Sequence, residues 1–365
     1  MPRPLSRRHA GLSVRALAGA LFSLAVLGPT AQAAPVGKVD GGPCIAFDAH
    51  GYRYIAFGRT GVAEPGVYLA TNRTGTWRLS LHPVTSGDRC AAIMVDASGH
   101  IHMLATRPIA DDPNGNYDLY YATNRSGAWR ASKVHYGEVG VASLAIDRTG
   151  RANIAISDED GVFVFRRAAN GGWLVAYDTS GVPSHLRVDP GGTLWLVVRD
   201  ASHRRFVRLM NRAGDWTVSR IPLRYSNGVD IDLAIDGLGR RSLARYDGTT
   251  GYVNIYRDLG ASWPRVDRTQ AHAGRLLSEA IAEPDGSLHM LFGFFRPPDT
   301  SGVVDQNHHG GRWQTQLVGY STDRSDIDVD RRGRVGAVFD RDGVIWSYWN
   351  DWTGTPHRFR VSELG

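Results

Sequence analysis

The stretch "YATNRSGAW" at residues 121–129 nearly repeats "LATNRTGTW" at residues 69–77. Fainter copies follow along the chain, and each combines Asn or Asp with a Gly and a closing Trp. These copies are RAANGGW (167–173), LMNRAGDW (209–216), YRDLGASW (256–263) and QNHHGGRW (306–313). Because self-similarity at a fixed period is typical of repeat architectures, this phrase decides how the rest of the chain is interpreted.

A second signature, an acidic residue followed three positions later by Gly, precedes each copy. The first example is "IAFDAHG" at residues 45–51 and the last is "IDVDRRG" at residues 327–333. The acidic residues follow one another at spacings of 48, 51, 42, 47, 47 and 47, and they are Asp48, Asp96, Asp147, Asp189, Asp236, Glu283 and Asp330. Seven units of this length fill the chain after its N-terminal segment.

Each unit has the same order of elements. An alternating apolar run ends at the acidic turn, in which the acid accepts hydrogen bonds from its own backbone and Gly takes the left-handed conformation. A second β-rich run, a variable loop and a third run lead into the Asn-x-x-Gly-x-Trp turn, and a fourth run begins at the Trp. Four short antiparallel strands at a period in the forties predict a propeller blade.

We therefore predict an all-β fold, a seven-bladed β-propeller with four antiparallel strands per blade. Each blade is complete within its own repeat, so blade one should pack against blade seven without a shared strand. A four-stranded sheet cannot bury both faces alone, so the turn tryptophans should pack between neighbouring blades. They are Trp77, Trp129, Trp173, Trp216, Trp263 and Trp313.

The Asn-x-x-Gly-x-Trp turn resembles the Asp-box, or BNR repeat, of sialidase-type propellers, which reads Ser-x-Asp-x-Gly-x-Thr-Trp. Asn72 stands where that Asp would, Trp77 keeps the five-residue spacing, and Gly75 is displaced by one position. The resemblance covers all seven units and implies the fold. It implies no single activity, because such repeats serve sialidases, polysaccharide lyases and propeller lectins. The Arg-Ile-Pro motif of sialidases is absent, since "RPI" at 107–109 has the wrong order, and no catalytic residue is carried over.

Residues 1–33 have a basic start, an apolar stretch and the small-residue ending Ala31-Gln32-Ala33. This pattern predicts a signal peptide cleaved before Ala34, leaving residues 34–365 as a single secreted or periplasmic propeller domain. Secretion by the general or by the twin-arginine route stays open. Removing the four arginines of this segment lowers the formal net charge from +6 to +2. We expect neither nucleic-acid binding, which needs a basic face, nor a membrane span.

The only cysteines, Cys44 and Cys90, lie at the entry of adjacent inner strands, four and six residues before their turn aspartates. Export permits a disulfide between them, which would tie blade one to blade two. The two-residue offset leaves open whether their Cα atoms come within bridging range.

The repeat register identifies one position at the channel mouth, four residues before each acidic turn residue. In chain order it holds Cys44, Ala92, Ser143, His185, Asp232, Glu279 and Asp326. The last four are ionisable, and ionisable side chains are costly to bury dry, so we expect them to face one solvated funnel.

Our candidate catalytic residues are therefore His185, Asp232, Glu279 and Asp326. The alternative is that they are polar lining of a water-filled channel. If they form a site, Glu279 should have the raised pKa, because acidic neighbours flank it.

Arginines surround this position in the predicted register. Two residues further along the inner strands, Arg187 and Asp328 interrupt an otherwise apolar set. Arginine pairs with planar carboxylates in a bidentate manner, which favours an anionic, uronate-type glycan as the ligand. The candidate ligand-binding residues are Arg187, Arg59, Arg107, Arg245, Tyr246 and Arg296.

The segment "DDPNGNYD" at residues 111–118 carries the only hint of a metal. Asp112, Asn114, Asn116 and Asp118 alternate at two-residue steps, as oxygen donors do in short calcium loops. The Gly is one place off the EF-hand pattern and the closing Glu is missing, which favours a turn without metal. We expect no other cofactor.

Three functions remain open. The first is a secreted glycan-binding lectin, and the second is a cell-envelope platform for protein interaction. The third is a carbohydrate-active enzyme: a glycosidase using Asp232 and Glu279, or a polysaccharide lyase with His185 or Tyr246 as base and Arg187 neutralising a uronate. The loops differ between blades and the ionisable arc is one-sided, which favours one asymmetric site over a multivalent lectin. We expect a monomer with an extracellular glycan as partner.

Overall fold

The computed structural model describes residues 42–59, 66–82, 89–109, 112, 116–137, 139–212, 215–225, 230–270, 275–296, 300–309, 312–320, 325–341, 344–350 and 357–360. Contacts between Cα atoms divide the chain into Met1–Ala33 and Ala34–Gly365, and every described residue belongs to the second unit. Within these ranges, no helix has the length and apolar character needed to cross a membrane.

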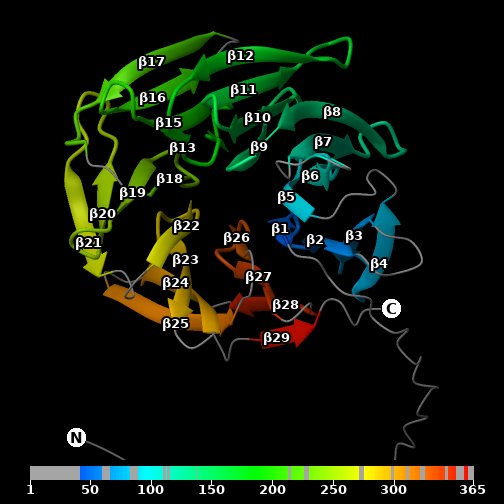
Figure 1. Ribbon diagram of the computed structural model, residues 1–365. Coiled ribbons are helices and arrows are strands. Elements are labelled where there is room, and N and C mark those ends of the chain that lie inside the picture. Colours follow the sequence, from blue (N-terminus) through cyan, green and yellow to red (C-terminus); the bar gives the residue numbers. More distant parts are fainter. Residues whose placement is uncertain are drawn as a thin grey trace, which may run out of the picture. The chain divides into compact units, whose positions relative to one another are not determined.

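The described strands group into seven antiparallel sheets, each built from consecutive strands (Figure 1). The first sheet contains β1 (Cys44–Phe47), β2 (Arg53–Arg59), β3 (Gly66–Thr71) and β4 (Arg78–His82). The second contains β5 (Arg89–Val95), β6 (Ile101–Pro108), β7 (Tyr117–Thr123) and β8 (Arg130–Gly137). The third contains β9 (Ala142–Ile146), β10 (Ala152–Ser157), β11 (Val162–Arg167) and β12 (Trp173–Thr179).

The fourth sheet departs from the others because its innermost strand is split. Its members are β13 (Val182–Pro183), β14 (Arg187–Val188), β15 (Leu194–Asp200), β16 (Arg205–Asn211) and β17 (Trp216–Ile221). Both β13 and β14 pair with β15. His185 lies in the gap between them, where the backbone leaves the ladder.

The remaining three sheets each have four strands. The fifth contains β18 (Ile231–Ile235), β19 (Arg241–Asp247), β20 (Tyr252–Arg257) and β21 (Arg265–Gln270). The sixth contains β22 (Arg275–Ala282), β23 (Leu288–Arg296), β24 (Thr300–His309) and β25 (Arg312–Tyr320). The seventh contains β26 (Ser325–Val329), β27 (Val335–Arg341), β28 (Val344–Asn350) and β29 (His357–Arg360).

The sheets stand around a central channel, with the first strand of each sheet innermost (Figure 1). Successive inner strands contact one another, and β26 of the seventh sheet contacts β1 of the first. The fold is therefore a β-propeller of antiparallel four-stranded blades. Among the described residues no strand is exchanged between the first and seventh sheets, so closure rests on packing, as the completeness of each repeat predicts.

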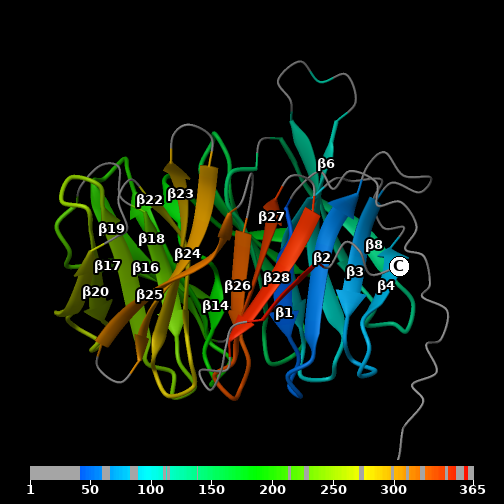
Figure 2. The same ribbon diagram turned by 90° about the horizontal axis from the view of Figure 1, so that it is seen from below.

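Both repeated phrases form tight turns, which gather at one end of the strands (Figure 2). In the acidic turn, Asp48 Oδ1 accepts hydrogen bonds from the N–H groups of His50 and Tyr52, both at 2.9 Å. In the second turn, Asn72 Oδ1 accepts the N–H of Arg53 at 2.7 Å, and Gly75 has a φ of 86°. Gly at this left-handed position avoids the strain that a side chain would cause.

The turn tryptophans pack between neighbouring sheets, as predicted. Seven apolar clusters each join two adjacent sheets, and the six turn tryptophans belong to six of them. Trp216, for example, lies with residues of the third and fourth sheets and packs against Tyr177, with ring centroids 6.4 Å apart. These clusters supply the burial that a single sheet cannot provide.

Cys44 and Cys90 form a disulfide with Cα atoms 5.9 Å apart, which settles the question left open by their offset. The bridge joins the inner strands of the first two sheets.

Titration of the unfolded, unreduced protein should therefore find no reactive thiol. Because the bridge closes a loop of 46 residues, its reduction should lower the free energy of unfolding by about 4 kcal/mol in urea denaturation. Two reactive thiols in the unreduced protein would contradict this.

Candidate functional site

The inner strands place their side chains in a regular way. Cys44 and Ala46 of β1 pack toward the second sheet, whereas Ile45 and Phe47 pack toward the seventh. An inner strand has no further strand on its channel side, so the N–H and C=O groups on that edge need other partners. Because Cys44 packs toward the second sheet, we expect the equivalent side chain in each repeat, four residues before the turn acid, to point at the next sheet along the chain. We call this the staple position, because its side chains connect one sheet to the next.

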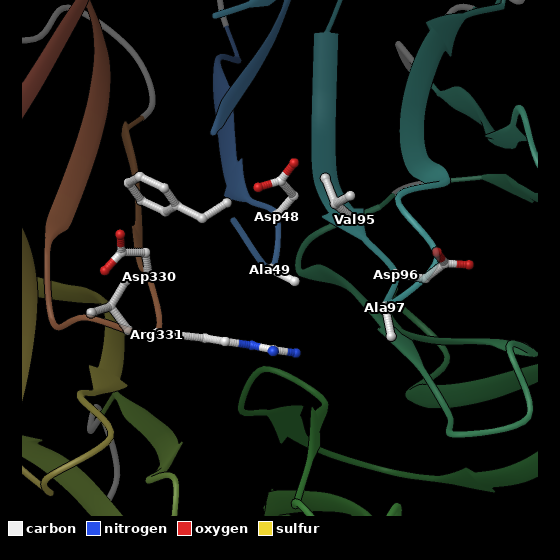
Figure 3. A pocket seen from close by; sticks show the side chains of 9 residues that line it. Asp48, Ala49, Val95, Asp96, Ala97, Asp330 and Arg331 are labelled. Atoms are coloured by element: carbon white, nitrogen blue, oxygen red, sulfur yellow. The ribbon is translucent and has the colours of Figure 1, made fainter. Parts of the chain in front are cut away.

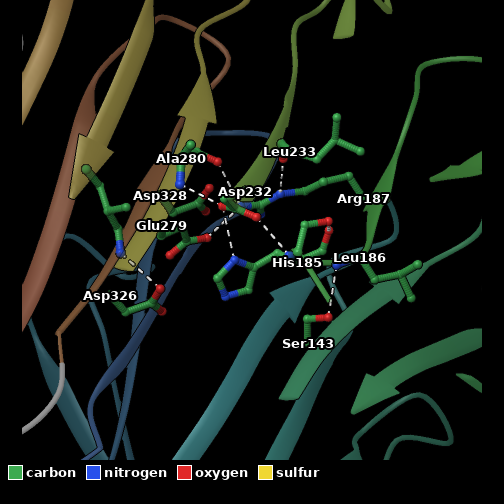
Figure 4. Close-up of polar contacts among 12 residues, drawn as sticks. Ser143, His185, Leu186, Arg187, Asp232, Leu233, Glu279, Ala280, Asp326 and Asp328 are labelled. Atoms are coloured by element: carbon green, nitrogen blue, oxygen red, sulfur yellow. Dashed lines mark hydrogen bonds and ion pairs between the residues drawn. The ribbon is translucent and has the colours of Figure 1, made fainter. Parts of the chain in front are cut away.

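Staple side chains accept backbone N–H groups from the next inner strand (Figure 4). Ser143 Oγ accepts the N–H of Leu186 at 2.9 Å. Asp232 Oδ2 accepts the N–H of Ala280 at 2.6 Å. Asp326 Oδ2 accepts the N–H of Ile45 at 2.8 Å. In all three cases the donor lies three residues before its own turn acid, so the same contact repeats around the ring.

The other staple residues make different contacts with the next sheet. Cys44 makes the disulfide, His185 Nδ1 lies 3.1 Å from Asp232 Oδ2, and Glu279 shares a hydrogen bond with Asp326. The four ionisable candidates thus form one continuous band, but each also occupies a separate interface between sheets. The contacts of the band are therefore contacts between sheets. Asp232 is 2% exposed, so its role is to join the neighbouring sheets and not to line the channel.

Arg187, on β14, contacts two of these carboxylates and two backbone carbonyl groups. Its guanidinium lies 2.7 Å from Glu279 Oε1 and 3.4 Å from Asp232 Oδ2. It also donates to the carbonyl oxygens of Leu233 at 3.1 Å and Ala280 at 3.0 Å. One arginine thereby joins the fourth, fifth and sixth sheets, and its charge is neutralised within the protein.

The ionisation of Asp232 and His185 follows from their contact. Burial by itself raises the pKa of Asp232, but the charge and hydrogen bond of His185 and the charge of Arg187 lower it to about 2. Burial by itself lowers the pKa of His185, but the charges of Asp232 and Glu279 raise it above its usual value. His185 is thus inclined to carry a proton and is poorly suited to act as a base.

The prediction that Glu279 has the raised pKa is wrong. Burial raises the pKa of Glu279, but the charges of His185 and Arg187 and a hydrogen bond from Asp326 lower it overall. Burial, the charge of Glu279 and the hydrogen bond to Glu279 instead raise the pKa of Asp326 well above its usual range. The proton of this carboxyl pair therefore resides on Asp326, because the cations lie beside Glu279.

Asp328 is a second carboxyl of β26 whose pKa is raised. Its Oδ2 accepts the N–H of Phe47 at 2.9 Å, and its Oδ1 accepts the N–H of Val329 at 2.8 Å. Burial and the charge of Glu279 raise the pKa of Asp328 to about 7, although both hydrogen bonds and Arg187 lower it.

The band borders a cavity of about 320 Å³ inside the ring of inner strands. His185, Arg187, Glu279, Asp326 and Asp328 lie on one side of it. The opposite wall is formed by small and apolar residues of β1, β5 and β9, including Ala46, Ala91, Ala92, Met94 and Ala142. The side chains of His185 and Arg187 are 26% and 24% exposed, so both are accessible from this cavity.

A second, smaller cavity of about 150 Å³ opens at the end of the channel where the acidic turns lie (Figure 3). Its lining includes Asp48, Asp96 and Asp330 from three of these turns, with the side chain of Arg331 beside them. The carboxylates already accept backbone N–H groups of their own turns. Because each repeat places an acidic turn at this end of the channel, carboxylates line the cavity. Among its described lining residues, Arg331 is the only ionisable one that is not a turn acid.

Four of the remaining ligand-binding candidates, Tyr246, Arg59, Arg245 and Arg107, do not line the larger cavity. Tyr246 is buried in the apolar cluster between the fifth and sixth sheets, where it cannot act as a base. Arg59 stacks on Tyr68 and the buried Arg245 on Phe206, with guanidinium-to-centroid distances of 4.7 and 5.5 Å. 

Two further arginines complete this set of candidates. Arg107 is exposed on β6. The side chain of Arg296 lies outside what the structure describes.

The calcium candidate stays untested as a site. Asn114 lies outside the described residues. Asp118 pairs with Lys133 at 2.5 Å, and Asp112 Oδ2 accepts hydrogen bonds from Asn116 and Tyr136. The described ranges contain no group of three His, Cys, Asp or Glu placed to hold a metal ion.

Sequence reasoning missed two members of the band. Ser143 is not ionisable and so was not among the sequence-predicted candidates, although its hydroxyl can accept a hydrogen bond as a carboxylate does. Asp328 was noted as an interruption of an apolar set and given no role. The signal that could have found both is the unpaired N–H edge of the next inner strand, which any propeller must satisfy.

Comparison with known proteins supports the fold only. No family model matches the chain, and no curated protein matches it. Among solved structures, a streptogramin B lyase matches with a TM-score of 0.57 and 12% identity, covering 86% of this chain and 94% of the other. The propeller domain of the Trilobed protease from Pyrococcus furiosus, described as having an open velcro topology, matches with a TM-score of 0.53 and 10% identity, covering 88% and 97%.

A third similar structure is a protein from Bacteroides uniformis provisionally assigned as a 6-phosphogluconolactonase. It matches with a TM-score of 0.55 and 14% identity, covering 82% of this chain and 92% of the other. The functions given for these three proteins differ, and identities this low establish the propeller fold without an activity.

Because the band joins neighbouring sheets, Asp232→Ala should greatly reduce the free energy of unfolding. The substitution leaves the N–H groups of His185 and Ala280 without their acceptor and removes a partner of Arg187. We expect the free energy of unfolding in urea to fall by about 3–5 kcal/mol, the range for breaking a buried ion pair. Asp160→Ala, at an exposed loop position, is the matched control and should change it by less than about 0.5 kcal/mol. A loss below about 1 kcal/mol for Asp232→Ala would show that the band is dispensable for stability.

Proposed function

We propose that this protein is an exported, seven-bladed propeller of the Asp-box type, in which each of the seven described sheets is one blade. We further propose that it recognises a hydroxyl-rich ligand, an extracellular glycan, at a single asymmetric site in the channel. The observation that carries this proposal is the cavity itself, with hydrogen-bonding groups on one wall and small apolar residues on the other. Its export to the periplasm or medium and its monomeric state are part of the same proposal and rest on the sequence.

The chemistry of the two walls fits a sugar. Ligand pockets combine apolar surface with a few convergent polar groups that fix orientation. Glu279 supplies an acceptor, and the protonated Asp326 and Asp328 can both donate and accept, which matches the hydroxyl groups around a sugar ring. The C–H face of the ring would pack on Ala46, Ala92 and Met94 across the cavity.

The charge of the site changes the expected ligand. An anionic, uronate-type glycan requires a cation free to pair with it, and Arg187 is already paired with Glu279 and Asp232. Of the arginines whose side chains the structure describes, Arg59, Arg107 and Arg245 do not line the cavity. Neutral glycans are therefore better supported than uronates.

Catalysis is the second candidate, and one observation favours it. Asp326 holds a proton next to Glu279 on the cavity wall, the condition for a general acid. The separation argues against ordinary glycoside hydrolysis, because carboxyls that share a hydrogen bond are closer than the roughly 5–9.5 Å that such enzymes use. The lyase roles drawn from the sequence also lose support, since His185 is inclined to be protonated and Tyr246 is buried. A protein-interaction platform is the outcome if no glycan binds.

The cavity can be tested by filling it. A neutral-glycan array with a depolymerisation panel first identifies the ligand, and Ala92→Phe should then abolish binding, because the ring occupies the apolar wall without removing a hydrogen bond. Ala97→Phe, in the smaller cavity at the turn end, is the matched control and should leave binding unchanged. Melting temperatures check that both variants fold, and Ala142→Phe provides a second cavity-filling variant. Full binding by folded Ala92→Phe and Ala142→Phe would exclude this cavity as the site.

A further inference from the structure

The contact between the first and seventh sheets is unlike the other contacts around the ring. The chain is not continuous across it, and among the described residues no strand is shared across it. The disulfide secures the first sheet to the second, on its other side. We call the contact between the first and seventh sheets the seam.

Two carboxyls of β26 hold the inner edge of the seam. Asp326 Oδ2 accepts the N–H of Ile45, and Asp328 Oδ2 accepts the N–H of Phe47. Both donors lie on β1, and both point away from β2 toward the channel. The seam is thus the place where two acidic side chains, rather than one, bind the edge of the next strand.

Apolar residues of the first and seventh sheets pack closely behind these carboxyls. A Cβ atom added to Gly336 would lie 2.8 Å from Phe47 Cζ, so the ring of Phe47 depends on the absence of a side chain there. Further out, the guanidinium of Arg53 lies over Trp77 of the first sheet and Trp349 of the seventh, at 5.1 and 5.4 Å from the ring centroids.

The charged groups around the two carboxyls are unbalanced. β22 contributes Glu279, and beyond it lie Asp232 of β18, Arg187 of β14 and His185. Arg187 and His185 pair with Asp232 and Glu279, so in the described part of the chain no ion pair reaches Asp326 or Asp328. β1 contributes no titratable side chain, because Cys44 is in the disulfide, and β27 places Val338 and Gly336 opposite the two carboxyls. Ionising both would leave two partly buried negative charges beside Glu279.

We propose that Asp326 and Asp328 form a proton-controlled latch, which keeps the seam closed while they carry protons and lets the ring open there when they ionise. Opening the seam exposes both partly buried carboxyls fully to water, where a carboxyl ionises readily. The closed ring therefore binds more protons than the open ring, and its stability is lost as the pH rises. Since the pKa of Asp328 is raised to about 7 from its ordinary value of 3.8, this loss falls between about pH 4 and pH 7.

Native-state hydrogen exchange of the Ile45 and Phe47 amides tests the latch directly, because these are the N–H groups that the carboxyls hold. After correction for the intrinsic effect of pH on exchange, the opening constant should rise between pH 5 and pH 7 by about tenfold per pH unit for each linked proton. The amide of Ile154, on β10 of the third sheet, reports opening elsewhere and should change less. An opening constant that is independent of pH would overturn the proposal.

Variants separate the latch from general instability. Asp328→Asn should reduce the pH dependence at Ile45 and Phe47 by about tenfold per pH unit, whereas Asp160→Asn should behave as the wild type. If Asp328→Asn retains the full dependence, or if Ile154 opens in parallel with Ile45 in the wild type, the latch is not local to the seam and the proposal is wrong. The wild-type series decides the matter even if the variant fails to fold.

Discussion

A four-stranded sheet with two apolar faces cannot be stable alone, and this constraint governs the whole molecule. Every sheet buries its faces against its neighbours, which is why seven apolar clusters each bridge two sheets and why the turn tryptophans recur. The same geometry leaves the channel edge of each inner strand without a partner. Ser143, Asp232 and Asp326 meet that second requirement by accepting exposed N–H groups of the next inner strand.

The candidate site is a consequence of how the staples differ. Where the staple position holds Ser143 or the disulfide cysteine Cys44, the channel wall is small and neutral. Where it holds Asp232, Glu279 and Asp326, carboxyls crowd together, and Arg187 and His185 offset only part of their charge. The protons retained by Asp326 and Asp328 are the physical result, and they give one side of the cavity hydrogen-bonding groups that a ligand can use. Structure and candidate function therefore share the same residues.

The repeat made the architecture predictable, because the Asp-x-x-Gly and Asn-x-x-Gly-x-Trp turns have local causes that can be identified in a sequence. The register also located the staple position and gathered His185, Asp232, Glu279 and Asp326 correctly. It could not show which way those side chains point, so it predicted neither their role between sheets nor that Asp326 rather than Glu279 has the raised pKa. Tyr246 and Arg245 pack away from the cavity for a related reason: alternation along a strand does not say which face meets a neighbouring sheet.

The contacts of Arg187 predict that the band is one coupled network between sheets. A double-mutant cycle on Arg187→Met and Glu279→Gln, with urea unfolding at constant pH, measures that coupling. Residues in one buried network show coupling energies of about 0.5–3 kcal/mol. We expect a coupling of at least about 1 kcal/mol, with Glu279→Gln costing less once Arg187 is absent. Additive losses within about 0.3 kcal/mol would show that the band consists of separate polar residues along the channel.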